Sequence, residues 1–194
     1  TPSGSLRFNI NEDLMLWASY AEGFKSGGFF GRQANFQNID VTFEPESVDN
    51  IELGIKSSLL DGRMTLNAAY FQSEYENKQE SVLVPRGLAD VATIVRNAAT
   101  EDIKGVEIDL SFQVTENWFV RANYGYLDAS YDEFVADIDG GAQIELTDNS
   151  YLRPRNTPEN TFGISTTYTA AIGPGNLQGA LAYRYRDAIE VDLV

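Results

Sequence analysis

The chain has 194 residues, no cysteine, and a formal net charge of -15 from 14 basic and 29 acidic side chains. Disulfides and thiolate metal sites are therefore excluded, and the acidic balance argues against nucleic acid as a partner, because binding there needs Lys and Arg to neutralise phosphate. No segment approaches the roughly 18 consecutive apolar residues of a helical membrane span.

Short and long connections alternate along the chain. We expect tight turns at residues 11–13, 60–63, 115–117 and 172–176, and long polar loops at 25–47, 79–101 and 132–159. In an antiparallel sheet this order places every tight turn at the same end. Such a rule is typical of outer-membrane β-barrels, which have short periplasmic turns and longer extracellular loops.

Between these connections, apolar and polar residues alternate, as expected of strands with two unlike faces. The pattern is cleanest at 106–114, where Val106 and Ile108 alternate with Glu107 and Asp109, and it recurs at 50–56, 118–126 and 177–186. A soluble sheet with one face on a core predicts the same alternation. Alternation alone therefore leaves the fold class open.

Strand length and aromatic placement favour the membrane. Segments 13–24, 63–77, 102–114 and 118–131 run about 12 to 15 residues, whereas strands of soluble proteins usually have about 5 or 6 and tilted membrane strands need about 9 to 11. Aromatic residues such as Tyr20, Phe24, Trp118 and Tyr183 gather toward segment ends, as in the interfacial girdles of membrane barrels. The competing explanation is that aromatics are ordinary strand formers.

Two turn signals support hairpins. Asp61-Gly62 lies between two alternating runs and suits a type I′ turn, which needs positive φ at both central residues. The run Gly173-Pro174-Gly175-Asn176 punctuates the last hairpin. We therefore predict an all-β fold, with one continuous antiparallel sheet of about eight strands.

Four pieces of the sequence together resemble the barrel of TonB-dependent outer-membrane receptors. They are Glu22-Gly23-Phe24-Lys25-Ser26-Gly27-Gly28, Glu44-Pro45-Glu46 before the strand that carries Glu52 and Gly54, Asn97-Ala98, and Lys104-Gly105-Val106-Glu107. The resemblance extends over nearly the whole chain. It implies that residues 1–194 are part of a larger transmembrane barrel of about 22 strands, whose plug domain and terminal strands are absent here.

The resemblance also implies a function. Receptors of this family lie in the outer membrane of Gram-negative bacteria, surrounded by lipid and lipopolysaccharide, and take up scarce nutrients, most often ferric siderophores. Energy comes from the TonB complex, which would act through the absent plug. We expect neither an enzyme nor a cofactor. An isolated open sheet would leave unpaired edges in lipid, so we expect the chain to be a fragment without signal peptide, plug or TonB-contacting segment.

In such a barrel the polar strand face points into the lumen, where water and the plug can satisfy charge. The charges expected there are Glu52, Lys56, Glu107, Asp109, Arg121, Arg184 and Arg186. Some of them would pair with plug residues and be released when the plug moves.

Ligand contacts are expected on the long loops, because loops on a rigid scaffold can vary without disturbing it. Arginines suit anionic siderophore complexes, and aromatics suit planar groups. The candidates are Phe29, Phe30 and Arg32 on the first loop, Arg86 and Arg96 on the second, and Arg153 and Arg155 on the third. The ordinary explanation for each is a bond to loop backbone or a bridge to lipopolysaccharide.

An acidic group raises the question of calcium. Asp128, Asp132, Glu133, Asp137 and Asp139 lie close together in the sequence, and oxygen-rich clusters can bind this ion. Their spacing does not match an EF-hand, so a solvated acidic loop is favoured and no metal site is predicted. The glycines near 23–31 are expected to set backbone turns and not to bind phosphate.

Three other functions remain open from the sequence. A small eight-stranded structural barrel would fit the strand count. A soluble β-sandwich adhesin or sugar-binding module would pack its apolar face on a second sheet. An outer-membrane hydrolase is disfavoured, because without histidine the chain cannot build the usual Ser-His arrangement. Within the receptor family, cobalamin, haem and oligosaccharides are alternatives to a ferric siderophore.

Overall fold

The structure is a computed structural model that describes residues 1–29, 42–87, 90–138 and 145–191, with the side chains of 83–92 outside the description. All regular elements in these ranges are β-strands. Within the same ranges, no helix has the length and apolar character needed to cross a bilayer. The predicted all-β antiparallel fold is confirmed.

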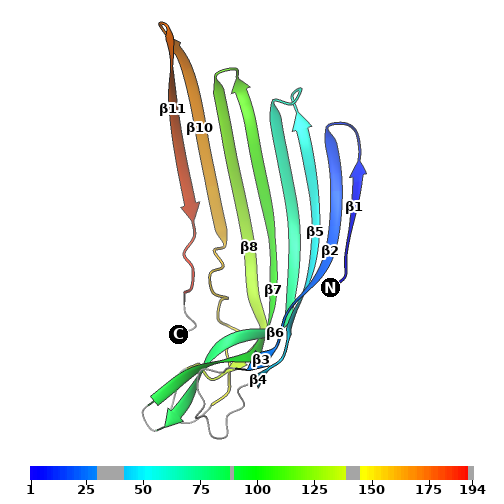
Figure 1. Cartoon of the computed structure of the whole chain (residues 1–194), viewed down its shortest axis with the longest axis vertical. Helices are drawn as coiled ribbons and strands as arrows, with labels where there is room; N and C mark the ends of the chain where they lie inside the picture. The colour runs from blue at the N-terminus through cyan, green and yellow to red at the C-terminus, as the bar shows by residue number, and fades with distance from the viewer. Residues whose placement is uncertain (30–41, 88–89, 139–144, 192–194) are drawn as a thin grey trace.

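One antiparallel sheet dominates the molecule (Figure 1). Its strands, in spatial order, are β1 (Ser3–Asn9), β2 (Leu14–Lys25), β5 (Glu46–Leu59), β6 (Met64–Gly87), β7 (Asp90–Thr115), β8 (Trp118–Ala136), β10 (Asn160–Ile172) and β11 (Gly175–Arg186). The short β9 (Thr147–Asp148) pairs with β8, and β3 (Gly28–Phe29) pairs with β4 (Thr42–Phe43) in a separate ribbon. The sheet is open, with β1 and β11 at its two edges.

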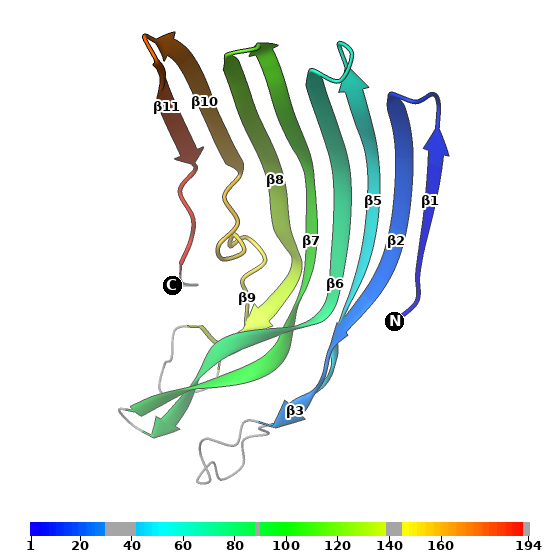
Figure 2. The same ribbon diagram turned by 45° about the horizontal axis from the view of Figure 1, so that its top comes forward.

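The connections divide the sheet into two ends, as predicted. All four tight turns lie together at the upper end in Figure 2, which we call the turn end, and the long connections lie at the opposite, loop end. In the turn between β5 and β6, Asp61 and Gly62 have φ values of 56° and 79°, and Arg63 N donates to Leu60 O at 3.2 Å. Asp61-Gly62 thus occupies the centre of a tight turn with the positive φ values that a type I′ turn requires.

One face of the sheet, which we call the outward face, carries a continuous band of apolar residues. Register places Leu53 of β5 opposite Tyr70 of β6, Tyr70 opposite Val106 of β7, and Val106 opposite Tyr126 of β8. The side chains are accessible: Leu53 is 51% and Ile51 is 50% exposed. No described strand or segment packs a second sheet on this band, unlike in the sandwich considered above.

A row of acidic residues limits this band at the loop end. Glu22, Asp49, Glu74 and Asp102 are direct partners across four neighbouring strands, β2, β5, β6 and β7. Alternation puts them on the same face as the apolar band, one ladder row beyond Tyr20 and Ile51. Carboxylates do not continue an apolar surface, so the apolar band ends at this row.

The opposite face, which we call the inward face, is polar, and at two positions a large ring on it lies over a glycine of the neighbouring strand. A Cβ atom at Gly54 of β5 would come within 2.3 Å of Trp17 Nε1, so the Trp17 indole lies directly on the glycine of the neighbouring strand. Phe71 covers Gly105 in the same way, 2.7 Å from its ideal Cβ position. Glycine at these positions lets large rings of adjacent strands lie flat against the wall.

The second long connection differs from the loop that we expected at 79–101. It is as long as predicted, but β6 and β7 continue through most of it as one hairpin, so these strands have 24 and 26 residues. The ladder is interrupted between Tyr75 and Gln79, where Asn77 has a φ of 52°. Beyond this bulge the hairpin bends away from the sheet (Figures 1 and 2), because an extra residue bends and twists a strand pair.

The hairpin packs on the end of β8 and on the connection that follows it. The buried hydrophobic residues of the described chain are all found here: Val82, Ile94, Ala99, Tyr131, Phe134 and Ala136, with Ala98, Ile138 and Leu152 packed against them. Tyr131 and Phe134 stack at 4.8 Å between ring centroids. We call the described residues of 78–101, 131–138 and 145–157 the external cap.

Candidate functional site

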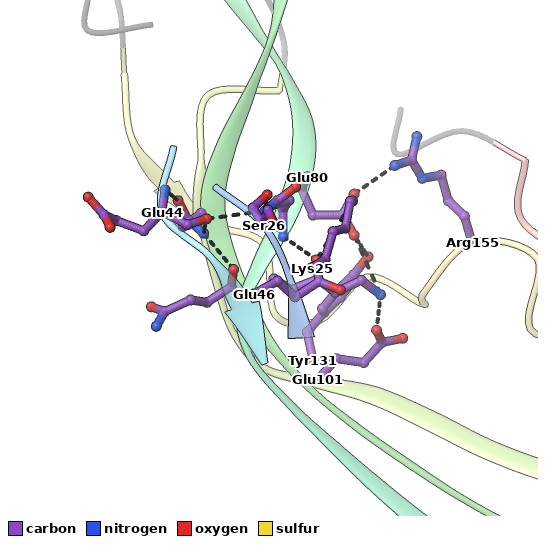
Figure 3. A network of polar contacts seen from close by, with 12 residues as sticks. Lys25, Ser26, Glu44, Glu46, Glu80, Glu101, Tyr131 and Arg155 are labelled. Atoms are coloured by element: carbon purple, nitrogen blue, oxygen red, sulfur yellow. Dashed lines mark hydrogen bonds and ion pairs between the residues drawn. The ribbon is translucent and has the colours of Figure 1, made fainter. Parts of the chain in front are cut away.

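The candidate site is a polar network at the base of the external cap, where three connections meet (Figure 3). Glu80 of β6 and Glu101 of β7 are its centre, with only 3% and 1% of each residue exposed. Carboxylates are almost never buried this deeply unless they are paired. Their partners therefore decide whether this part of the molecule is stable.

Lys78 and Arg155 supply the opposite charge. The Lys78 ammonium contacts the Glu101 carboxylate and lies 3.6 Å from Glu80 Oε1. Arg155, from the connection between β9 and β10, donates from Nη2 to Glu80 Oε2 at 2.6 Å. Tyr131 Oη donates to Glu80 Oε1 at 3.2 Å. Both oxygens of Glu80 are thus occupied, by groups from different segments.

The network shifts the pKa of two of its members. Burial lowers the pKa of Lys78, against the opposing pull of Glu80 and Glu46. Burial also raises the pKa of the Tyr131 phenol, and the neighbouring Glu80 carboxylate adds to this. The phenol therefore stays protonated and keeps donating to Glu80 at any physiological pH.

A second set of bonds ties the first long connection to the hairpin. Gln79 Nε2 donates to Ser26 O and Glu44 O, each at 3.1 Å, and Gln79 N donates to Glu46 Oε2 at 2.8 Å. Asn97 Oδ1 accepts a hydrogen bond from Glu44 N at 2.7 Å, and Asn97 Nδ2 donates one to Glu44 O at 2.9 Å. Both ends of the 26–46 connection are therefore fixed to β6 and β7.

Glycine is needed where these segments meet. A Cβ at Gly27 would lie 2.6 Å from Phe43 O and 2.9 Å from Pro45 N, which are backbone atoms that cannot turn away. Three of the sequence pieces that carried the family resemblance, around Gly27, Glu44 and Asn97, thus come together in space. In this structure they hold the connections together.

The candidate ligand residues fall into three groups. Phe29 on β3 is 73% exposed, and Arg153 is an exposed residue with Nη2 3.5 Å from Glu159 Oε2. Arg96 is half-buried opposite Glu80 in the ladder, and Arg155 is engaged by Glu80. Phe30, Arg32 and the side chain of Arg86 lie outside the described part of the chain. Their contact with a ligand stays a prediction.

The expected lumen charges share one face of the sheet. Lys56, Asn67, Asp109, Asn123, Gly163 and Arg184 follow one another across the ladder from β5 to β11, and Glu107 and Arg186 belong to the next row. Lys56, Glu107 and Asp109 line one hollow of the inward face. Arg121 lies 5.7 Å from the Phe119 ring centroid, and Glu52 receives a hydrogen bond from Asn50 at 3.2 Å.

The acidic residues near the end of β8 do not form a metal site in the part of the chain that the structure describes. Asp128 lies 3.3 Å from Lys104, and Asp137 is buried and receives Glu145 N at 3.3 Å. Asp132 and Glu133 are exposed, and Asp139 lies outside the described residues.

The sequence reasoning missed Lys78, Glu80, Glu101 and Tyr131. Glu80 and Glu101 lie within the expected polar loop at 79–101, and Lys78 and Tyr131 each lie one residue before an expected loop. A charged residue in a loop is normally solvated. One signal was present: Val82 and Ile94 are apolar residues of a strand-forming type inside the expected loop. That signal could have indicated a hairpin, although not its buried charges.

Comparison with known proteins agrees with this geometry. Residues 1–193 match the family model for the beta-barrel described as TonB dependent receptor-like. The chain is 27% identical over 173 residues to the ferric-pyoverdine 358 receptor of Pseudomonas putida, with 87% of this chain and 18% of that protein covered. It is 25% identical over 172 residues to the probable TonB-dependent siderophore receptor PiuA of Acinetobacter baumannii, with 87% and 22% covered. The chain thus spans about a fifth of these relatives.

Solved structures show the same fold. The ferric yersiniabactin uptake receptor FyuA from Yersinia pestis superimposes with a TM-score of 0.74 at 20% identity, over 98% of this chain and 26% of that one. The siderophore receptor PiuA from Acinetobacter baumannii gives a TM-score of 0.70 at 23% identity, over 98% of this chain and 26% of that one. At these identities the likeness concerns the fold alone.

Proposed function

Because the chain belongs to the TonB-dependent receptor β-barrel family, we propose that it forms part of the wall and external cap of a Gram-negative outer-membrane receptor, which takes up a ferric siderophore with energy from the TonB complex. The observation that carries the proposal is the pairing of a lipid-type outward face with a charged inward face on strands that, apart from β1, have 12 to 26 residues. The role is transport and not catalysis.

The outward face supports the membrane location. Large apolar side chains are exposed along the sheet, including Leu53, Tyr124, Ile164 and Leu181, and soluble monomers rarely leave such a band in water. Tyr20 and Trp118 lie toward opposite ends of the band, where interfacial aromatics are expected. Lipid would cover this band, and lipopolysaccharide would meet its loop end.

The inward face supports a filled lumen. Among the described residues, none forms an ion pair within 4 Å with Lys56, Glu107 or Arg184. A plug domain carried by the rest of the protein would meet these charges, and the TonB complex would act through it. Replacing Arg121 by Ala should destabilise the barrel more when the plug is present than when it is deleted; equal destabilisation would contradict the contact.

The relatives and the cap support the proposed ligand class. One relative is named as a ferric-pyoverdine receptor and another as a probable siderophore receptor, and the cap carries Arg96, the exposed Arg153 and the exposed Tyr151. Guanidinium groups suit the anionic oxygens of iron chelates through bidentate bonds. Phe29, Arg96 and Arg153 are the proposed contacts, together with Phe30, Arg32 and Arg86.

Growth-linked transport tests the proposal. The gene for the full-length protein is deleted, and the uptake of labelled ferric pyoverdine, other ferric siderophores, cobalamin and maltodextrins is compared with and without a proton uncoupler. Loss of uncoupler-sensitive uptake of one ferric siderophore is the expected result. Loss confined to cobalamin or maltodextrin would replace the substrate, and loss of no energised uptake would overturn the receptor function.

A further inference from the structure

The external cap is held together by three kinds of contact that all join the same two parts, the β6–β7 hairpin with the end of β8 and the segment 149–155. The first is the apolar core, in which Leu152 packs against the buried cluster that contains Ile94 and Phe134. The second is a set of backbone anchors: Asn149 N donates to Phe134 O at 2.7 Å, and Phe134 N donates to Ser150 Oγ at 2.9 Å. The third is the ion pair between Arg155 and Glu80.

Glu80 has a divided role in this arrangement. Its Oε1 receives Tyr131 Oη and faces Lys78, both of which belong to the hairpin and β8, whereas its Oε2 receives Arg155 of the following segment (Figure 3). One carboxylate therefore joins both parts of the cap. Removing one partner of a buried ion pair leaves an uncompensated buried charge, which is far more costly than losing a surface pair.

These contacts are unlike those expected of loops that move separately. Mobile segments have few buried apolar contacts and many exposed backbone hydrogen bonds. Here Asn149 is 3% exposed and donates from Nδ2 to Ala136 O at 3.0 Å, and Pro154 is fully buried. The segment 149–155 is anchored at its beginning, middle and end.

We propose that the external cap is one preassembled body and that Glu80 is the positioning residue which fastens its two parts, so that a ferric siderophore meets a fixed surface and not loops that close independently. The part that concerns the siderophore rests on the proposed function. The assembly itself rests on the core, the anchors and the ion pairs alone.

Electron-spin distance measurement tests the assembly. Nitroxide labels are attached to Thr93→Cys on the hairpin and Tyr151→Cys on the following segment, both exposed positions, in the full-length receptor without ligand. This chain supplies no other cysteine. We expect one narrow distance distribution. A broad or two-peaked distribution in the otherwise unchanged protein would overturn the proposal.

Two matched pairs of variants test Glu80. Glu80→Gln and Arg155→Gln should each broaden the distribution and raise limited proteolysis within 78–101 or 145–157 on the order of tenfold, because cleavage follows the open population. Glu76→Gln and Arg153→Gln are the controls, since both residues are exposed and lie on the same strand or segment. The double variant should be no broader than the broader single one. Equal behaviour of Glu80→Gln and Glu76→Gln would remove Glu80 from this role.

The same labels separate this proposal from the receptor function. Ferric pyoverdine, or the ferric siderophore that the wild type takes up, is added to saturation, and the distribution should stay unchanged. A shifted peak would show that the two parts close on the ligand, and would overturn the fixed surface. Absence of any uptake by the wild type would instead defeat the receptor function and leave the ligand-free result valid.

Discussion

The membrane-type sheet and the external cap are made from the same strands but are stabilised in opposite ways. In the sheet, β5, β6 and β7 form a single layer, in which Ile51 and Leu53 remain about half exposed. In the cap, which the same strands β6 and β7 enter, Val82 and Ile94 are only 3% and 0% exposed. The sheet relies on its surroundings for burial, whereas the cap provides its own.

This difference shows that a strand does not have one environment along its length. The bulge at Asn77 separates the two regimes on β6. Before it, residues face outward or inward from the wall; after it, the hairpin turns and packs on β8. The charges follow the same division, because Lys56 and Glu107 line an open inward face, while the half-buried Lys78 pairs with the buried Glu101.

Removing a core side chain should give the largest effect and should affect the cap alone. Phe134→Ala deletes a ring that is 0% exposed, and truncation of a buried Phe costs about 3 to 5 kcal/mol. We expect faster amide exchange throughout 78–101 and 145–157, with the exchange of β1 and β2 unchanged. Tyr168→Ala removes an outward ring that is 54% exposed and is the control. Loss of protection spreading through the whole sheet would contradict the independence of the cap.

A charge on the outward face should damage the sheet and spare the cap. Ala68 of β6 lies between Ile55 and Ile108 in the apolar band, while the preceding Asn67 lies between Lys56 and Asp109. Arg at the membrane midplane costs about 2 to 4 kcal/mol, so Ala68→Arg should lower the denaturant midpoint of the barrel. Asn67→Arg, on the opposite face, should be tolerated. Similar midpoints for the two variants would mean that the outward face is not in lipid.

A smaller effect is expected where a large ring covers a glycine of the neighbouring strand. Gly54→Ala would place a methyl group 2.3 Å from Trp17 Nε1, and overpacking of this kind costs about 1 to 3 kcal/mol. Trp17 fluorescence should change together with a lower denaturant midpoint. Gly179→Ala is the control, since no heavy atom lies within 4 Å of its ideal Cβ position. If Gly54→Ala matched this control in both readouts, the indole would not depend on the glycine.

Most of the sheet could be predicted from the sequence because its causes are local. Alternation in 50–56 and 106–114 is a property of each strand alone, and the turn at Asp61 and Gly62 depends on two residues. The number of strands and their two ends follow from these patterns. Each of these predictions agrees with the structure.

The cap could not be predicted because its causes are distant in sequence. Glu80 is buried by Tyr131 and Arg155, which are 51 and 75 residues away, and no pattern within 79–101 indicates that contact. Arg155 was predicted from its residue type to contact an anionic ligand, whereas the structure pairs it with Glu80; its contact with a ligand stays a prediction. A buried charge depends on where its partner lies, which a local pattern does not contain.

The smallest expected effect is pH-dependent and concerns the edge of the cap. Asp148 of β9 receives both Ser150 Oγ at 2.6 Å and Ser150 N at 2.9 Å, and the hydroxyl bond, more than the backbone bond, lowers the pKa of this carboxyl group. A carboxyl pKa that is lower in the folded than in the unfolded state stabilises the fold above its unfolded value, and this contribution is lost as the pH falls through the folded value.

Acidification from neutral pH to below the ordinary pKa of an aspartate should therefore loosen the segment around Ser150 before it affects the sheet. A nitroxide at Tyr151→Cys should become more mobile over this range. Asp148→Asn should start more mobile at neutral pH and lose the pH response, because Ser150 also holds Phe134 N and is no longer fixed by a charge. An equal response in both proteins would place the acid sensitivity elsewhere, whereas its loss in the Asn variant would show that even the exposed edge of the cap is ordered by contacts within the chain, unlike the sheet.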